Sequence, residues 1–218
     1  IVVLDHHRQG SEVIQNAVLS YIEPYASSAC EMVAEILQYI VDKPKLKNIE
    51  ADAMYSGILV DTDNFVIKAG VRTFEAAAYL RRAGADVTRV RKMFREDMEH
   101  CRIRTAIINK AEIYMDEFAI STFDGENVSG ATVVGAKAAN ALLNIQGIRG
   151  SFVLTALQDY IYVSARSIDE LNVQVIMEKF GGGGHLTMAA AQLKDVSLSD
   201  AAEMLKHTLR KMHEDGDI

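Results

Sequence analysis

An acidic residue and two histidines stand side by side near the start of the chain, directly after four apolar residues. Residues 1–4 have the composition of a buried strand, and Asp5, His6 and His7 follow at once. In open α/β sheets, ligands bind at the carboxyl ends of the strands. Imidazole together with carboxylate suits a catalytic manganese, iron or zinc ion. This run therefore indicates a metal site, although short runs of the same residues also occur on solvated loops.

A further carboxylate follows a second apolar run. Asp61 comes directly after the apolar residues 58–60, and we expect the arrangement of the opening run to recur here, with Asp61 at the end of a short buried strand. Considered alone, Asp61 is better explained as a turn carboxylate at a strand end. Residues 61–64 begin like a calcium-binding loop, but Phe65 and Val66 stand where such a loop needs a ligand and a glycine, which excludes an EF-hand.

Four consecutive glycines, residues 181–184, separate a predicted helix from His185. One glycine would be enough to stop the helix, and four cost conformational entropy on folding. They can be interpreted as a backbone loop whose N–H groups approach an anion, with His185 as a further donor and Arg166 as a positive charge. The alternative is an ordinary junction between helix and loop, because neither a Walker lysine nor the GxGxxG spacing is present. Both interpretations stay open.

Strand-like and helix-like segments alternate along the chain, which predicts an α/β fold with two lobes. The first lobe, residues 1–87, is expected to be a truncated domain with a parallel sheet. Residues 88–115 form a charged amphipathic stretch without Pro or Gly, and we expect one long helix that connects the lobes. The second lobe, residues 116–218, is expected to be a smaller α/β domain.

Local signals predict the elements within the lobes. Ser28 followed by Glu31 predicts the start of a helix, and Gly84 predicts the end of another over residues 73–82. Asp169 is expected to cap the helix ahead of the glycines. The other predicted elements are helices at 49–55, at 131–144 and from Ser199 onward, and strands at 118–123, 152–157 and 160–167, the last two joined as a hairpin.

The composition limits the kinds of function that the chain can have. Its 218 residues are 49% hydrophobic, which is enough for one sizeable core or two modest ones. The formal net charge of −7 argues against binding of long nucleic acid, while a local pocket can still hold a short nucleotide. Two widely separated cysteines and the lack of an apolar run of about 18 residues indicate a soluble, cytoplasmic chain without membrane contact. Because the chain opens on Ile inside an apparent strand, we interpret it as a fragment.

Several motifs occur in an order that is typical of one family. They are IVVLDHH, EPYASSACEMV, GILVDTDNF and GVRTFEAAAYLRRAGAD in the first lobe, and SARS and LNVQVIMEKFGGGGHLTMAAAQL in the second. With these motifs over nearly its whole length, the chain resembles the DHH phosphoesterase superfamily with its DHH-associated C-terminal domain. Within that superfamily it is most similar to the bacterial cyclic-di-AMP phosphodiesterases of the GdpP type.

The resemblance implies roles for residues of the first lobe. Members of the family use two divalent metal ions, usually Mn²⁺, bridged by water or hydroxide. His6 and Asp61 would both be ligands of one of these ions. Asp5 would orient an imidazole or the neighbouring backbone, and His7 would face the phosphate, so that both residues take part in catalysis.

The resemblance also implies that the second lobe is a nucleotide-binding domain. The residues around the nucleotide would be Arg166, Asn172, Gly182, Gly183, Gly184 and His185. At position 188 the chain has Met where the family pattern has a polar Asn. If this position touches the base or the ribose, the affinity or the specificity for nucleotide is in question.

The implied reaction is the hydrolysis of cyclic-di-AMP to the linear dinucleotide pApA, in which hydroxide attacks phosphorus between two metal ions. In the family, the other metal ligands come from a His-and-Asp motif and a separate Asp ahead of the DHH run, and the sequence given has nothing before Ile1. We therefore expect the fragment to be catalytically impaired, although its parent is an enzyme.

Two alternatives to this function stay open. One is a phosphodiesterase of short oligoribonucleotides, which uses the same metals, and the other is a nucleotide-binding module without turnover. The helix expected at residues 88–115 also suggests a homodimer. The resemblance further suggests a membrane-anchored parent in which this part faces the cytoplasm.

Overall fold

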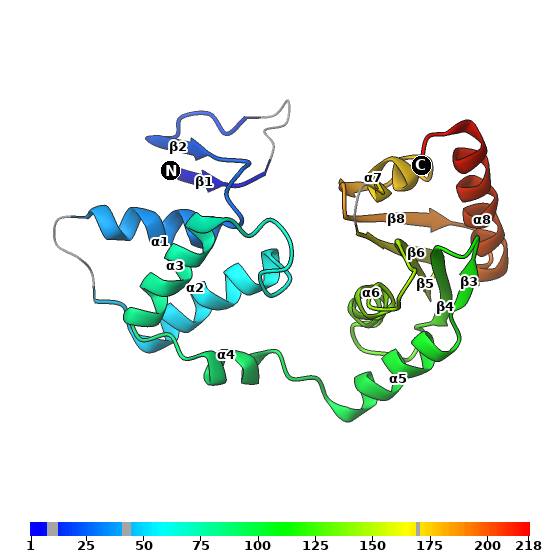
Figure 1. Ribbon diagram of the computed structural model, residues 1–218, viewed down its shortest axis with the longest axis horizontal. Coiled ribbons are helices and arrows are strands. Elements are labelled where there is room, and N and C mark those ends of the chain that lie inside the picture. The colour runs from blue at the N-terminus through cyan, green and yellow to red at the C-terminus, as the bar shows by residue number, and fades with distance from the viewer. Residues whose placement is uncertain (8–12, 41–44, 169–170) are drawn as a thin grey trace. The chain divides into compact units, whose positions relative to one another are not determined.

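The computed structural model describes residues 1–7, 13–40, 45–168 and 171–218, and it divides into two compact units (Figure 1). The first unit spans Ile1–Arg95 and the second spans Glu96–Ile218. The second unit was expected to be the smaller of the two, but it is the longer. Asp169, which was predicted to cap a helix, lies outside the described residues. None of the helices in these ranges is long and apolar enough to cross a membrane.

A short parallel sheet opens the first unit. Strands β1, Val2–Asp5, and β2, Leu19–Ile22, pair in parallel with Asp5 opposite Ile22. This pairing agrees with the parallel sheet expected for the lobe. The helices that follow are α1, Ala29–Tyr39; α2, Asn48–Asp61; α3, Val71–Arg82; and α4, Val87–Met93.

The helices of the first unit begin and end where the backbone finds a partner or a suitable conformation. Ser28 accepts a hydrogen bond from the backbone N–H of Glu31 at 3.0 Å and begins α1, as predicted. The carboxylate of Glu31 is buried and accepts a hydrogen bond from the hydroxyl of Ser27. Gly84 follows α3 with a φ of 113°, which agrees with its predicted role at the end of that helix. The core of this unit includes Ala34, Ala51, Ile58, Ala76, Leu80 and Val90.

The predicted strand at residues 58–60 was wrong. These residues belong to α2, so Asp61 ends a helix and does not follow a strand. Ile58 is fully buried in the helical core, whereas Val60 is 60% exposed. An apolar run this short fits a strand and a helix equally well, and here it continues the helix that begins at Asn48.

The single connecting helix predicted over residues 88–115 was also wrong. Helix α4 ends at Met93, α5 spans Met98–Asn109, and strand β3 occupies Glu112–Tyr114. The side chain of Asp97 accepts a hydrogen bond from the backbone N–H of His100, which starts a new helix instead of continuing the old one. The division between the units falls in this interruption, so the helix that suggested a homodimer is absent.

The second unit contains a six-stranded sheet in the order β3-β4-β5-β6-β8-β7. Strands β4 and β5 are parallel, and the other neighbouring pairs are antiparallel. The predicted hairpin is confirmed, because Leu157 of β5 lies opposite Tyr160 of β6. Besides β3, the strands are β4, Phe118–Asp124; β5, Gly150–Leu157; β6, Tyr160–Ser167; β7, Gly183–His185; and β8, Met188–Lys194.

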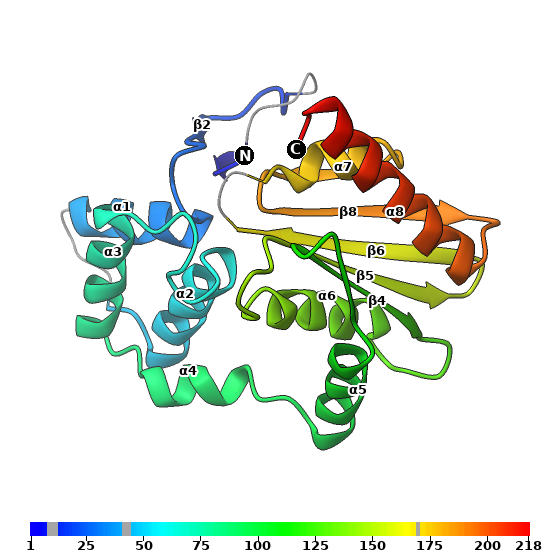
Figure 2. The same ribbon diagram turned by 45° about the vertical axis from the view of Figure 1, so that its right-hand side comes forward.

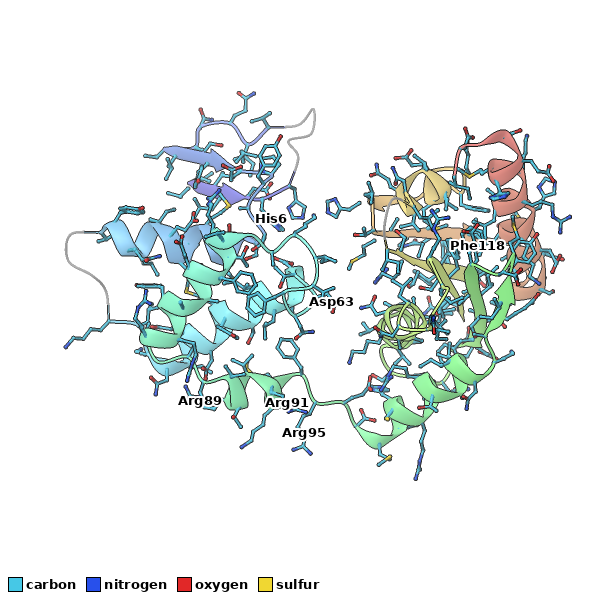
Figure 3. All side chains as sticks on the ribbon, viewed as in Figure 1. His6, Asp63, Arg89, Arg91, Arg95 and Phe118 are labelled. Carbon is cyan, nitrogen blue, oxygen red and sulfur yellow. The ribbon has the colours of Figure 1, made fainter. Side chains whose placement is uncertain are left out.

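Helices cover both faces of this sheet (Figure 2). One face packs against α7, Val173–Glu178, and α8, Leu198–Asp215, around a core that includes Phe118, labelled in Figure 3. The other face packs against α5 and α6, Ala131–Leu142. Because side chains alternate along a strand, each strand contributes to both layers.

Candidate metal and nucleotide sites

His6 and Asp61 are far apart in the sequence and adjacent in the first unit. His6 follows β1 and Asp61 ends α2, and the distance between His6 Nε2 and Asp61 Oδ2 is 3.7 Å. The His6 side chain is 12% exposed and that of Asp61 is 38% exposed. The structure therefore brings together the two residues that were expected to share one ion, although Asp61 is carried by a helix.

The chemistry and spacing of this pair suit a divalent metal ion. Ligand atoms about 2.0–2.2 Å from one ion are about 3–4 Å apart, which includes the separation of His6 and Asp61. The other ring nitrogen, His6 Nδ1, is buried and has no hydrogen-bond partner among the residues that the structure describes. A buried nitrogen without a hydrogen-bond partner costs stability, and a bound ion or a functional role is among the explanations for such a group in a native structure.

The described residues supply only part of a metal site. Within residues 1–7, 13–40, 45–168 and 171–218, no group of three or more His, Cys, Asp or Glu side chains is placed to hold an ion. Catalytic ions usually have about three protein ligands. His6 and Asp61 therefore fit as two ligands of one ion, and they do not complete its coordination.

Asp5 makes hydrogen bonds with His7. Its Oδ1 accepts a hydrogen bond from the backbone N–H of His7 at 3.0 Å and lies 2.7 Å from His7 Nδ1. The hydrogen bond from the His7 backbone, together with that from its ring, lowers the pKa of Asp5, so the carboxylate is charged at neutral pH. The rings of His6 and His7 lie 4.3 Å apart, centroid to centroid. Asp5 thus fixes the orientation of His7 beside the candidate metal ligand.

The loop after Asp61 is a feature that sequence reasoning missed. Asp63, Asn64 and Phe65 have φ values of 43°, 59° and 68°, and none of them is glycine. A left-handed conformation costs about 1–2 kcal/mol for such a residue. Asp63 marks this loop in Figure 3, at the same end of the unit as His6. The sequence DTDNF, residues 61–65, was the signal that could have indicated this loop. It was considered only as a calcium-binding loop, which it does not fit.

Side-chain contacts hold this strained loop in place. The Thr62 hydroxyl donates to the Ile58 carbonyl at 2.7 Å and accepts from the Phe65 backbone N–H at 3.0 Å. The Phe65 ring stacks on Phe74 with a centroid distance of 5.1 Å and meets Tyr55 edge-on at 6.2 Å. These contacts set the path of the chain directly after the Asp61 carboxylate.

The glycine run of the second unit begins in the turn after α7 and ends in strand β7. Gly181 has a φ of 72° after α7, and Gly183 and Gly184 belong to β7. A Cβ atom at Gly182 would overlap the backbone of Ala190, and one at Gly184 would overlap Met188 and Ala189. At Gly183, by contrast, a Cβ atom would have nothing within 4 Å. Gly182 and Gly184 therefore allow β7 and the turn before it to lie close to β8, and Gly183 faces open space.

Strand register places Arg166 and His185 on one line across the sheet. Arg166 of β6 lies opposite Met188 of β8, and Met188 lies opposite His185 of β7. Arg166 Nε donates to Asn140 Oδ1 on α6 at 2.7 Å, which holds the guanidinium on the α6 side of the sheet. Met188, the position that departs from the family pattern, therefore stands between the two residues that were expected to bind nucleotide.

Asn172 has a local role in the structure. Its side-chain oxygen accepts a hydrogen bond from the backbone N–H of Gln174 at 3.0 Å, which makes Asn172 the N-cap of α7. The helix therefore begins at a residue that was expected to contact the nucleotide.

The sequence matches two domain families in the order of the two units. Residues 1–58 match the N-terminal domain of the DHH family, and residues 118–214 match the DHHA1 domain. Among curated proteins, the chain is 47% identical over 206 residues to the cyclic-di-AMP phosphodiesterase PdeA of Listeria monocytogenes, covering 94% of the chain and 31% of that protein. It is 45% identical over 218 residues to the cyclic-di-AMP phosphodiesterase GdpP of Geobacillus thermodenitrificans, covering 99% of the chain and 33% of that protein.

A solved structure shares the fold. The crystal structure of an exopolyphosphatase-related protein from Bacteroides fragilis aligns with a TM-score of 0.81 at 20% identity, covering 97% of this chain and 63% of that one.

The chain spans about a third of the length of the curated relatives, 31% of PdeA and 33% of GdpP. The two domain matches show that the chain carries a DHH-family N-terminal domain at residues 1–58 and a DHHA1 domain at residues 118–214.

Proposed function

We propose that the chain is the phosphodiesterase part of a protein that hydrolyses cyclic-di-AMP to the linear dinucleotide pApA. The observation that carries the proposal is the meeting of His6 and Asp61 at 3.7 Å beside the contact between Asp5 and His7. Two relatives that are 47% and 45% identical are named cyclic-di-AMP phosphodiesterases, which supports this substrate over other phosphodiesters.

The side chains have distinct roles in this proposal. His6 and Asp61 hold one divalent ion, which we propose to be one of two Mn²⁺ ions in the parent protein. When bound, such ions supply charge stabilisation at the phosphate and an activated water molecule. Asp5 keeps the His7 ring oriented so that the imidazole can donate to a phosphate oxygen. In the second unit, Arg166 and His185 hold the nucleotide, and Gly182, Gly183 and Gly184 let it approach the backbone of β7.

We further propose that the 218-residue chain by itself turns over poorly. Its described residues offer two ligands to one ion, fewer than the usual three. Calorimetric titration with Mn²⁺ tests this proposal, and tight binding of two ions per chain would contradict it. Incubation with cyclic-di-AMP and Mn²⁺, followed by chromatography of the products, measures the activity. Formation of pApA that stops on addition of chelator would show that the chain is a complete enzyme.

A nucleotide-binding module without turnover is the second candidate. It is favoured by the close packing of Gly182 and Gly184 against β8 in the second unit, which involves no metal ligand of the first unit. In this case the wild type would bind cyclic-di-AMP in the presence of chelator and would not hydrolyse it. The variant His185→Ala would lose this binding. Faster cleavage of short linear oligoribonucleotides than of cyclic-di-AMP would instead identify the chain as part of a phosphodiesterase of short oligoribonucleotides.

A further inference from the structure

A groove runs along the sheet of the second unit, next to the residues proposed to bind nucleotide. Its volume is about 490 Å³. It lies between the start of α6 and strands β6 and β8, and it reaches the glycine run. Its lining includes Thr132, Tyr162, Ser164, Gly182, Ala190 and Gln192.

Strand register arranges this surface in three successive rows. The first row is Arg166, Met188 and His185, the second is Ser164, Ala190 and Gly183, and the third is Tyr162 with Gln192. All three rows lie on the α6 side of the sheet, because Ser151, opposite Arg166, donates its hydroxyl to a carbonyl of α6. Rows are about 6.6–6.8 Å apart along a strand, so the third row is about 13 Å from the first.

The chemistry of the three rows matches the order of phosphate, sugar and base in a nucleotide. The first row carries the positive charge of Arg166, which attracts phosphate. In the second row Ser164 is buried, whereas Ala190 is exposed and a Cβ atom at Gly183 would have nothing within 4 Å, which leaves room above β8 and β7 for a sugar. The third row presents the half-buried ring of Tyr162 and the exposed amide of Gln192.

The third row fits an adenine base by two independent contacts. A tyrosine ring offers a stacking surface to any base, and such stacking contributes about 1–3 kcal/mol. A glutamine amide has one acceptor and two donor hydrogens, and it pairs with N6 and N7 of adenine, one hydrogen bond each way. Hypoxanthine, which has an oxygen in place of the N6 amine, cannot form the same pair.

We infer that this groove is a base-binding subsite, in which an adenine of the dinucleotide stacks on Tyr162 and pairs with Gln192. The inference rests on the proposed function, because the base reaches the third row only if the phosphate lies at Arg166 and His185. It adds a source of base specificity, at residues that lie outside the glycine motif.

Binding of two cyclic dinucleotides in the presence of EDTA tests the subsite without turnover. The full 218-residue chain is titrated calorimetrically with cyclic-di-AMP and with its inosine analogue, cyclic-di-IMP. We expect the wild type to prefer cyclic-di-AMP. Tyr162→Ala should weaken binding of both ligands about tenfold or more, and Tyr162→Phe should retain most of the affinity. Gln192→Ala should remove the preference for cyclic-di-AMP.

Controls and contrary outcomes separate the subsite from the proposed function. Gln174→Ala, a change on α7, should leave affinity and preference unchanged. Gln192 is exposed, so its replacement does not disturb packing, and melting temperatures identify any loss of folding in Tyr162→Ala.

The subsite is overturned if the wild type shows no preference, if it binds neither ligand, or if Tyr162→Ala and Gln192→Ala both behave as the wild type. Binding with the expected preference would leave the subsite standing even if the chain shows no Mn²⁺-dependent hydrolysis, because poor turnover of this chain is expected. Faster Mn²⁺-dependent cleavage of short linear oligoribonucleotides than of cyclic-di-AMP would instead overturn the proposed substrate.

Discussion

The two candidate sites are built in opposite ways. In the first unit, a strand end and a helix end supply His6 and Asp61, and a strained loop follows directly. In the second unit, Arg166, Met188 and His185 are aligned by the register of three neighbouring strands. The first site depends on side chains and on the packing of separate elements, while the second depends on backbone hydrogen bonds. The two sites should therefore fail under different kinds of substitution.

Loss of the imidazole of His6 should have the largest effect and should be confined to the first unit. His6→Ala removes one of two candidate ligands, and we expect Mn²⁺ affinity to fall about a hundredfold or more, since even changes behind a ligand cost about 10–100-fold. Affinity for cyclic-di-AMP in EDTA should stay the same. Calorimetry measures both quantities, with His207→Ala on α8 as the control for loss of an imidazole. A parallel loss of nucleotide binding would show that the two sites are not independent.

A single methyl group at Gly182, directly before β7, should disrupt the candidate site of the second unit and leave that of the first unit unchanged. Gly182→Ala would push a Cβ atom into the backbone of β8, and we expect a loss of about 1–3 kcal/mol in the free energy of unfolding, together with weaker nucleotide binding. Gly183→Ala is the matched control, because its Cβ atom would enter open space. Denaturant unfolding compares the two variants, and equal stabilities would refute the close-packing explanation.

The contacts of Phe65 should matter for both stability and metal binding in the first unit. Phe65→Ala removes the stacking on Phe74, and we expect a loss of about 1–2 kcal/mol in unfolding free energy for this half-buried ring. The left-handed conformation of the loop would lose its support, so Mn²⁺ affinity should also fall. Phe94→Ala, at a ring that is 45% exposed, is the comparison. If both variants bind Mn²⁺ as the wild type does, the loop does not position Asp61.

The smallest expected effect is a pH dependence that comes from Asp5. Hydrogen bonds from His7 lower the pKa of Asp5 in the folded chain, so the carboxylate stabilises the fold above its unfolded value of about 3.9. This contribution is lost as the pH falls through the lower, folded pKa. Asp5→Asn should therefore show a shallower decline of melting temperature below about pH 4 than the wild type. The effect is small because the Asp5 side chain is 40% exposed, and parallel curves would contradict it.

Local signals predicted the elements best where a short-range hydrogen bond or a two-residue turn decides the structure. Ser28 begins α1 and the turn at residues 158–159 closes the hairpin, as expected. The prediction failed where the same residues suit two structures. Residues 58–60 were assigned to a strand and form helix, and residues 88–115 were assigned to one helix and contain two helices and a strand. In both places the competing structures have similar local free energies, and packing or a cap such as Asp97 selects one.

The sequence by itself determined the kinds of residues available for chemistry and the order of the two domains. Asp5, His6, His7 and Asp61 could be named before their positions were known, because imidazole and carboxylate are chemically distinctive. Only the tertiary structure decided that His6 faces Asp61 from the end of a helix, that Asp5 turns to His7, and that Gly182 and Gly184 serve close strand packing. It also decided that Tyr162 and Gln192 share a row beyond the glycines. The physical reason is that register and helix packing bring distant residues together through contacts that no local pattern records.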